Sequence, residues 1–391
     1  MNLRDEIEET LRAWNAHEVN RGANPIIDFD YHPDATKVRP ATGRLEVYRR
    51  IGELHRLAEK SENRILAERL NADRAYLAAL MGERVPLTDY VSATQGCPAS
   101  GWPAEYVSER GEIARKSLDA LGIPWGAELE TDLAQLCGPA DPADAPDIIR
   151  DAAAEYEPAV REATGSDAPF ELTIETADVD EYWAYWLDGA GQQVRLRLNT
   201  RTARFTRFEG RQFALHEVLG HGLQNASYAA RCASEIVPWV RMTSIHALHQ
   251  VLLEGLAEAM PLFITPDDEI LIARVRLAHY TQLVKSELHL SINSGVSIEK
   301  CAEHAIARVP WWKDAHIGNF LADRGANPRL RTYLWAYPAG LDWFSALSQA
   351  DTNVINRVLH AAYRDPLSPR DLASLWPGGP PIGGPGTDRD G

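Results

Sequence analysis

Two histidines and a glutamate lie close together in the segment "FALHEVLGHGLQNA" (213–226). Neutral imidazole and carboxylate groups are good zinc ligands, and a catalytic zinc usually has three protein ligands and a water. His216 and His221 are therefore candidate metal ligands, and Glu217, directly after the first histidine, is a candidate general base. The chemistry that these residue types allow is metal-assisted hydrolysis.

The spacing of the two histidines differs from that of the usual H-E-x-x-H motif, in which they lie four residues apart. On a regular α-helix a separation of five residues turns through about 500°, which leaves the two side chains roughly 140° apart. A π-turn would bring His216 and His221 back over each other, and such turns cluster at functional sites. Gly220 precedes the second histidine and makes this distortion easier. A shared metal therefore predicts a π-bulge between the two histidines.

A third ligand is expected from the segment "SIHALHQVLLEGLAEAMPLF" (244–263), which has a strongly helical pattern. Glu254 and Glu258 lie one turn apart in it, so one carboxylate can complete the ligand set and the other can support a ligand histidine from behind. His246 and His249 lie a turn or so earlier and could reach the site, but such histidines are more often packed or exposed.

The stretch from His216 to His221 resembles the H-E-x-x-G-H motif of the dipeptidyl peptidase III family, a gluzincin-type zinc metallopeptidase family. The later "EGLAE" is similar to the glutamate motif of that family. This resemblance implies a zinc ion held by His216, His221 and Glu254, with Glu217 as the general base. It also implies that Glu258 lies behind a ligand histidine and accepts its remaining N–H.

A longer resemblance covers roughly residues 190–370. The order "HEVLGHGLQ", "LLEGLAEAM", "RVRLAHYTQLVKSELHLSINSGVSIEKCAEHA" and "YLWAYPAGLDWF" is similar to the C-terminal half of a bacterial family catalogued as domain of unknown function 885. It implies a helical, metallopeptidase-like protein with a substrate groove over the zinc helix. His289 matches a histidine of that family and is a candidate oxyanion contact, and Tyr337 is a candidate phenol donor. Arg274 and Arg276 could grip a substrate carboxylate, although surface arginines are the more usual outcome.

The elements that must position these residues are mostly helical. Apolar positions recur at three- and four-residue spacing over 3–16, 43–82 and 104–121, and again from Phe208 onward. Alternating apolar and polar residues predict three short strands, "FELTIET" (170–176), "YWAYWL" (182–187) and "QVRLRLN" (193–199). The last of these could be an edge strand that pairs with an extended substrate, or an ordinary sheet strand.

We therefore expect a mainly helical α+β protein, with a zincin-like fold and a small antiparallel sheet beside the active-site helix. The predicted regions are an N-terminal helical region (1–165), a catalytic region (166–376) and a disordered Pro/Gly-rich tail (377–391). Within the catalytic region we expect the sheet at 168–200, the zinc helices at 208–263 and the C-terminal helices at 266–376.

Composition restricts the partners and the location. The 391-residue chain has a net charge of −16 and no basic run, which argues against nucleic acid or an anionic membrane as a partner. No stretch approaches the roughly 18 apolar residues that span a bilayer, and the N-terminus has no apolar core of a signal peptide. The 4 cysteines are scattered without a C-x-x-C pair, as in a cytoplasmic protein with free thiols.

The sequence thus predicts a cytoplasmic, zinc-dependent hydrolase with one Zn²⁺ ion that cleaves a peptide or small amide. Iron also accepts two histidines and a carboxylate, and is the less favoured metal. One alternative is a metal-dependent enzyme of a small-molecule pathway on the same fold, with hydrolytic, lyase or oxidative chemistry. Another is a non-catalytic helical scaffold with a vestigial site.

Overall fold

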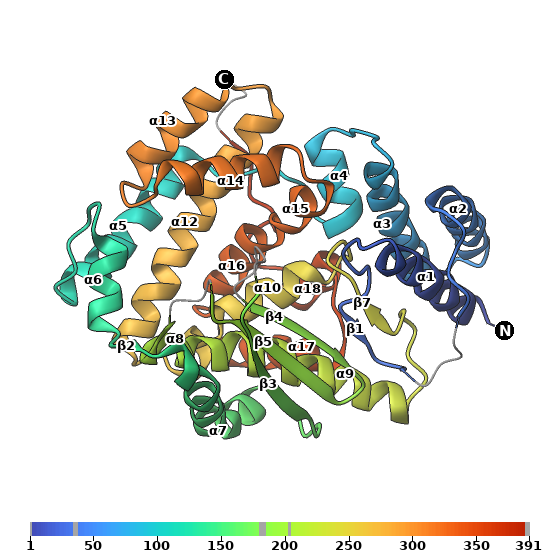
Figure 1. The fold of residues 1–391 in the computed structure, drawn as a ribbon, viewed down its shortest axis with the longest axis horizontal. Coiled ribbons are helices and arrows are strands. Elements are labelled where there is room, and N and C mark those ends of the chain that lie inside the picture. The colour runs from blue at the N-terminus through green and yellow to red at the C-terminus, as the bar shows by residue number, and fades with distance from the viewer. Residues whose placement is uncertain (1, 34–37, 180–184, 202–204, 388–391) are drawn as a thin grey trace.

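Helices make up most of the chain in the computed structural model, which describes residues 2–33, 38–179, 185–201 and 205–387 (Figure 1). The expected mainly helical α+β class is confirmed, with one small sheet near the middle of the molecule. The first half of the chain contains the following helices: α1 (Leu3–Asn20), α2 (Arg44–Lys60), α3 (Arg64–Leu80), α4 (Leu87–Gln95), α5 (Ala104–Ala120), α6 (Leu129–Leu136), the 3₁₀ turn η1 (Pro142–Asp144) and α7 (Ala145–Thr164).

The second half is helical from Arg207 onward. It contains the following elements: α8 (Arg207–Phe213), η2 (Ala214–Gly222), α9 (Leu223–Ser234), α10 (Gln250–Ala259), α11 (Pro261–Ile264), α12 (Glu269–Asn293), α13 (Ile298–Arg308), α14 (Asp314–Gly325), α15 (Pro328–Tyr333), α16 (Ala336–Leu347), α17 (Thr352–Arg364) and α18 (Pro369–Leu375). None of the described helices combines the length and the apolar composition that a membrane crossing needs.

The central sheet is mixed, not antiparallel as predicted. Its strand order is β3-β5-β4-β1-β7, from β3 (Glu171–Ala177), β5 (Gln193–Asn199), β4 (Tyr185–Ala190), β1 (Phe29–Asp30) and β7 (Met242–Thr243). The tight turn after β4 gives the expected antiparallel β4–β5 pair, but β3 pairs with β5 in parallel. A second, minor sheet joins β2 (Pro139–Ala140) to β6 (Phe205–Thr206). Part of the predicted strand 182–187 falls at 182–184, outside the described residues.

The strand "QVRLRLN" is not an edge strand, so of the two alternatives the structure supports the ordinary sheet strand. This strand is β5, and β3 and β4 take up its two sides along its length. On β4, the neighbour β1 pairs only at Gly189 and Ala190. The outer side of the preceding part of β4, from Tyr185 to Asp188, therefore has no strand partner among the described residues.

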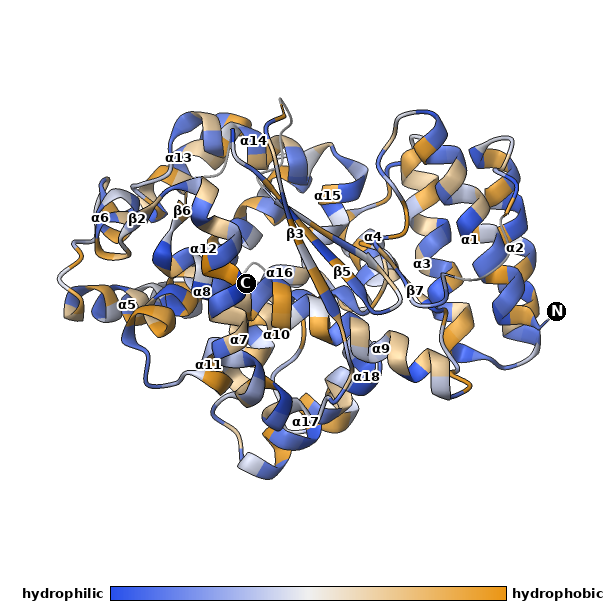
Figure 2. Cartoon of the chain, turned by 60° about the horizontal axis from the view of Figure 1, so that its bottom comes forward, coloured by the Kyte–Doolittle hydropathy of each residue, from blue (hydrophilic) through white to orange (hydrophobic). Residues whose placement is uncertain are grey.

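The region 1–165 is not one unit. Helices α1–α3 enclose a core of their own that also contains Val240 and Met242, whereas α5 and α7 contribute to the main core with α12 and η2. Both ribbon views place α1–α3 at one end of the molecule and α5 and α6 at the other (Figures 1 and 2). β1 follows α1 and lies in the central sheet, so the N-terminal region helps to build the centre of the molecule.

The tail is ordered over its described part, contrary to the prediction for 377–391. Gly101 donates its N–H to the carbonyl of Gly383 (3.0 Å), and Gly386 donates to the carbonyl of Gly101 (3.0 Å). Ile382 is buried in the main core. A Pro/Gly-rich composition predicted disorder, but backbone hydrogen bonds to a distant loop hold this segment in place.

Candidate metal centre

The two histidines lie in a helix that begins at Arg207, directly after the capping residue Thr206, and runs without a break through α8, η2 and α9. The Thr206 side chain accepts a hydrogen bond from the N–H of Glu209 (3.0 Å), and the Glu209 carboxylate accepts one from the N–H of Thr206 (2.7 Å). This capping box satisfies two N–H groups that a helix start leaves free. The capping box therefore fixes the start of the helix at Thr206.

The middle of this helix, Ala214–Gly222, is a π-helix, so the π-bulge predicted from the five-residue spacing is confirmed. The wider turn brings the carbonyl of Leu215 against Gly220, where a Cβ atom would lie only 2.7 Å from that oxygen. The same Cβ would lie 3.0 Å from the Cβ of Ala257 on α10. Gly220 thus allows both the wide turn and the close approach of α10, which carries Glu254.

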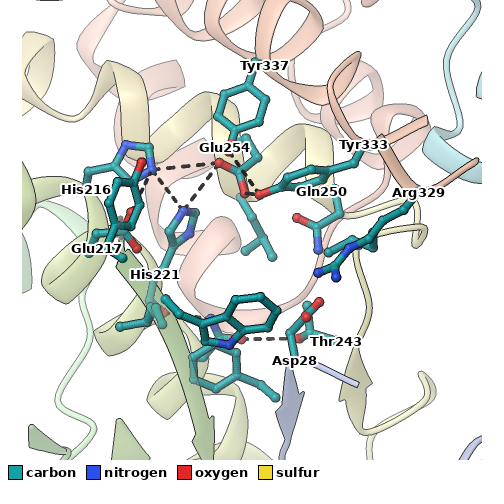
Figure 3. A pocket seen from close by; sticks show the side chains of 17 residues that line it. Asp28, His216, Glu217, His221, Thr243, Gln250, Glu254, Arg329, Tyr333 and Tyr337 are labelled. Carbon is teal, nitrogen blue, oxygen red and sulfur yellow. Dashed lines mark hydrogen bonds and ion pairs between the residues drawn. The ribbon is translucent and has the colours of Figure 1, made fainter. Parts of the chain in front are cut away.

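His216, His221 and Glu254 each direct one ligand atom at the same point, and these atoms all lie within 4.8 Å of one another. The two Nε2 atoms are 3.2 Å apart. Glu254 Oε2 lies 3.8 Å from His216 Nε2 and 3.6 Å from His221 Nε2. Figure 3 shows the three side chains converging from two helices at one side of a cavity.

These separations fit a tetrahedral metal site. Metal–ligand bonds of about 2.0–2.2 Å at tetrahedral angles place ligand atoms about 3.3–3.6 Å apart, close to the three observed distances. Glu254 is only 4% exposed, and its Oε2 atom has no hydrogen-bond partner among the described residues. A buried carboxylate oxygen without a donor needs a cation to offset its desolvation. The three side chains therefore suit a divalent metal with a fourth position left open.

Two tyrosines lie on the other side of Glu254. Tyr333, the last residue of α15, donates from its hydroxyl to Glu254 Oε1 (2.6 Å), and the Tyr337 hydroxyl lies 3.0 Å from that of Tyr333. Burial and the Glu254 carboxylate raise the pKa of both phenols well above the usual value, so both keep their protons. Tyr333 fixes one carboxylate oxygen and so directs the other toward the histidines. The Tyr337 hydroxyl remains available to a ligand in the cavity.

Close packing of α10 on α16 sets the distance between Glu254 and Tyr337. A Cβ atom on Gly255 would lie 2.4 Å from the Cα of Gly340, and one on Gly340 would lie 2.2 Å from the carbonyl oxygen of Val251. No side chain fits between these two backbones. The two helices cross at Gly255, one residue after Glu254, and at Gly340, three residues after Tyr337.

The charges of the cluster are those that a metal site requires. Burial, and then the neighbouring His221, lower the pKa of His216 to about 3, so this imidazole is neutral. Burial opposes ionisation of Glu254, but the two histidines and the Tyr333 hydroxyl lower its pKa to about 2. Burial also opposes the charged form of His221, while the Glu254 carboxylate raises its pKa. A cation at the common point would take the place of the His221 proton.

Glu217 lies beside the ligand atoms without being one of the converging three. Its Oε1 is 3.7 Å from His216 Nε2, and the residue lines the cavity. Burial, and to a lesser degree Glu254 and Glu258, raise its pKa to about 7 against the opposing effect of His221. A carboxylate in this place can accept a proton from a water molecule near neutral pH.

The structure does not show the predicted role of Glu258. This residue lines a small second cavity with His216, but it makes no hydrogen bond to either ligand histidine. Burial and Glu254 raise its pKa to about 7. Tyr333, which the sequence analysis missed, is the residue that hydrogen-bonds to a candidate ligand, and its only signal in the sequence is a position one turn before Tyr337.

His289 is not brought to the cavity. It is 1% exposed and packs edge-on to the Trp335 ring at 5.6 Å between centroids, so the predicted oxyanion contact by this residue lacks structural support. His246 is also buried away from the cluster, where its Nε2 lies 2.8 Å from Asp73. His249 lines a different cavity and precedes α10, because the predicted helix 244–263 begins only at Gln250.

The two arginines considered as carboxylate contacts bind elsewhere. Arg274 donates to the Gln212 side chain (3.1 Å) and lines the small cavity next to Glu258. Arg276 donates to Ser117 (2.8 Å) on α5.

The main cavity has a volume of about 240 Å³ and extends from the cluster of His216, His221 and Glu254 toward the sheet (Figure 3). Its wall includes two charged residues that the sequence analysis missed, Asp28 before β1 and Arg329 on α15. Both point into the cavity in Figure 3, on the side away from His216. The cavity is lined by Asp28, Phe29, Tyr185, Trp186, Leu187, His216, Glu217, His221, Asn225, Thr243, Ile245, Gln250, Leu253, Glu254, Arg329, Tyr333 and Tyr337.

Comparisons of this chain with protein-family models, with curated proteins and with solved structures found no match. The resemblances noted in the sequence stay predictions.

Proposed function

We propose that this protein is a zinc-dependent hydrolase that cleaves a peptide or amide bond in the cavity beside η2. The observation that carries the proposal is the convergence of two imidazoles and one buried carboxylate oxygen, which has no hydrogen-bond partner among the described residues. The distances between these three atoms are close to those around a tetrahedral metal ion. His216, His221 and Glu254 would hold the ion, and Tyr333 would orient the carboxylate.

A bound zinc ion supplies two things to such a reaction: it makes a water molecule more acidic, and it polarises the carbonyl group of the substrate. Glu217 would take the proton of the attacking water and return it to the leaving amine. A cation held by the cluster would lower the Glu217 pKa from its raised value, which keeps this carboxylate in the basic form at neutral pH. Tyr337 would donate its phenolic proton in a hydrogen bond to the substrate oxygen as negative charge develops there.

The position of Glu217 favours hydrolysis over oxidation. Iron can occupy the same ligand set, but oxidative chemistry has no need of a proton-accepting carboxylate beside the open position. Metal content of the purified protein distinguishes the two metals directly.

The test is hydrolysis of a panel of peptides and small amides by the zinc-loaded protein and by its Glu217→Gln variant. We expect the variant to keep stoichiometric zinc and to lose at least about a hundredfold in rate, because only the proton acceptor is removed. A variant with full activity would exclude Glu217 as the base. A wild-type protein that binds zinc at the cluster and hydrolyses no amide would support the non-catalytic alternative.

We also propose a cytoplasmic location, in which the four cysteines stay reduced. All four are unpaired in the structure, and three of them are buried. Fractionation of cells that express the tagged chain would test the location.

A further inference from the structure

Two oppositely charged side chains that face the main cavity have no hydrogen-bond or ion-pair partner among the residues that the structure describes. Arg329 stacks its guanidinium 5.4 Å from the centroid of the Trp186 ring, and its Nη1 atom is buried with no hydrogen-bond partner among the described residues. The Asp28 side chain likewise makes no hydrogen bond or ion pair within the described part of the chain. Although both residues line the same cavity, they do not form an ion pair with each other.

Charged side chains that face a cavity and have no partner among the described residues can bind a ligand of opposite charge. Both residues are partly buried, and removing a charge from water without a hydrogen bond is unfavourable, so a ligand with the opposite charge would stabilise each of them. The planar guanidinium of Arg329 matches a carboxylate, to which it can donate two parallel hydrogen bonds. Asp28 matches a cationic donor such as an ammonium group. Burial raises the Asp28 pKa to about 6 while Arg329 opposes that rise, and a cationic ligand would lower it further.

The pair of charges restricts the kind of ligand. The C-terminus of a peptide would bring a carboxylate to Arg329 and leave Asp28 unpaired, and an N-terminus would do the reverse. The head group of an α-amino acid carries both an ammonium and a carboxylate on one carbon. Gln250 adds to this fit, because its amide nitrogen donates to the carbonyl of Ser244 (3.0 Å) and its amide oxygen is left to accept from an ammonium.

We infer that the substrate is an amide on the side chain of a free α-amino acid, with Arg329 on the α-carboxylate and Asp28 on the α-ammonium group. This inference rests on the proposed hydrolase function, since it places the side-chain amide at the cluster of His216, His221 and Glu254. Two classes of compound fit, namely side-chain carboxamides and diamino acids acylated on the side-chain nitrogen. In either case water adds across the C–N bond, with hydroxyl to carbon and a proton to nitrogen.

The size of the cavity agrees with a substrate of this kind. Its volume of about 240 Å³ is below the range of roughly 300–1,000 Å³ that is typical of sites for larger ligands. A small molecule held at both ends would fill the cavity, whereas part of a longer peptide would have to extend out through its mouth.

Four hydroxamates of matched chain length test the inference, because a hydroxamate binds zinc directly. Glutamic acid γ-hydroxamate carries both head-group charges, glutaric monohydroxamate only the carboxylate, 4-aminobutyric hydroxamate only the ammonium, and butyric hydroxamate neither. Calorimetry on the zinc-loaded protein should give the highest affinity for the hydroxamate with both charges. The two compounds with one charge should bind more weakly, and butyric hydroxamate should bind most weakly. We expect about a tenfold gain in affinity or more for each charge, which makes the first at least about 100-fold tighter than the last.

Two variants assign each gain to its residue. Arg329→Gln should remove the advantage of the carboxylate, and Asp28→Asn should remove that of the ammonium. Arg274→Gln is the matched control, because it removes an equal charge next to the small cavity and should keep the wild-type ranking. Unchanged affinity for butyric hydroxamate shows that a variant is folded and still holds zinc.

The outcomes separate the two proposals. If the protein binds all four hydroxamates with equal affinity, the amino-acid head-group inference is wrong and the metal site stands. A ranking that survives in both Arg329→Gln and Asp28→Asn would also overturn the inference. If the protein binds none of the four, the hydrolase proposal itself fails, and the inference fails with it.

Discussion

Replacing Glu254 by alanine should separate the metal-binding role of α10 from a merely structural one. Glu254 Oε2 is one of three converging ligand atoms, whereas Glu258, one turn further along the same helix, hydrogen-bonds to neither histidine. Glu258→Ala is therefore a matched control, with the same substitution on the same helix and a charge close to the cluster. We expect Glu254→Ala to purify largely free of zinc and Glu258→Ala to retain it.

The size of the effect follows from the number of ligands. Zinc bound by four protein ligands gains about 10–16 kcal/mol at neutral pH, or about 2.5–4 kcal/mol for each ligand. Loss of one ligand of the three should thus raise the dissociation constant roughly 60- to 700-fold. Because the Glu254 pKa is about 2, the carboxylate is fully ionised at neutral pH, and its protonation does not reduce this figure.

The assay is competition for zinc against a chromophoric chelator, with elemental analysis of the dialysed proteins as a second readout. Thermal unfolding of the metal-free forms shows whether each variant is folded. If Glu258→Ala loses zinc and Glu254→Ala retains it, the assignment of the ligand to the first acid of "EGLAE" is wrong. Equal zinc affinity in both variants and the wild type would place the metal elsewhere.

Two further predictions concern Tyr333, which contacts Glu254, and the buried Asp342 on α16. Tyr333→Phe should weaken zinc binding by about 10- to 100-fold in the same competition assay, because it removes the 2.6 Å hydrogen bond that orients the ligand carboxylate; an unchanged affinity would contradict that role. Asp342→Asn should lower the free energy of unfolding by about 2–4 kcal/mol at pH 7, as measured by urea titration. The Asp342 carboxylate accepts hydrogen bonds from Trp102 (2.8 Å) and Tyr106 (2.6 Å) and lies 2.9 Å from His279 Nε2. Burial opposes ionisation of Asp342, but the contacts with His279, Tyr106 and Trp102 lower its pKa in the folded protein. The stabilisation that the carboxylate contributes is therefore complete above its pKa in the unfolded chain, about 4, and is lost as the pH falls through its pKa in the folded protein. The gap between wild type and variant should therefore shrink below about pH 4, and a gap that stays constant down to pH 2.5 would contradict the argument.

Local spacing was enough to predict the π-helix. The five-residue spacing of His216 and His221 predicts the helix geometry, because both side chains can reach a shared metal only if the turn between them is wider than that of an α-helix. Glu254 followed from the resemblance of a second short motif, and its helix presents it as expected. In contrast, the only sequence signal for Tyr333 is its position one turn before Tyr337, and the tertiary fold brings it to Glu254.

The charged wall of the cavity could not be predicted because it depends on long-range contacts. Asp28 and Arg329 are about 300 positions apart in the chain, and they meet only because β1 joins the central sheet next to β4. The parallel pairing of β3 with β5 has the same origin, since an alternating pattern predicts a strand but not its partner. The tail was mispredicted because its backbone hydrogen bonds to Gly101 depend on the folded loop, which composition does not describe.

The extra residue of the π-helix has a consequence for the evolution and engineering of this protein. Deleting one residue between Glu217 and Gly220 would restore the four-residue spacing of the common zinc motif and could keep both imidazoles on one metal. The same deletion would rotate every later residue of the helix by about 100°. Asn225, which accepts a hydrogen bond from Tyr31 (2.6 Å), and Tyr228, which donates to the carbonyl of Ala362 (2.6 Å), would both leave their partners. A single deletion is therefore not enough to convert the five-residue spacing into the four-residue spacing, because the residues of α9 would also have to repack.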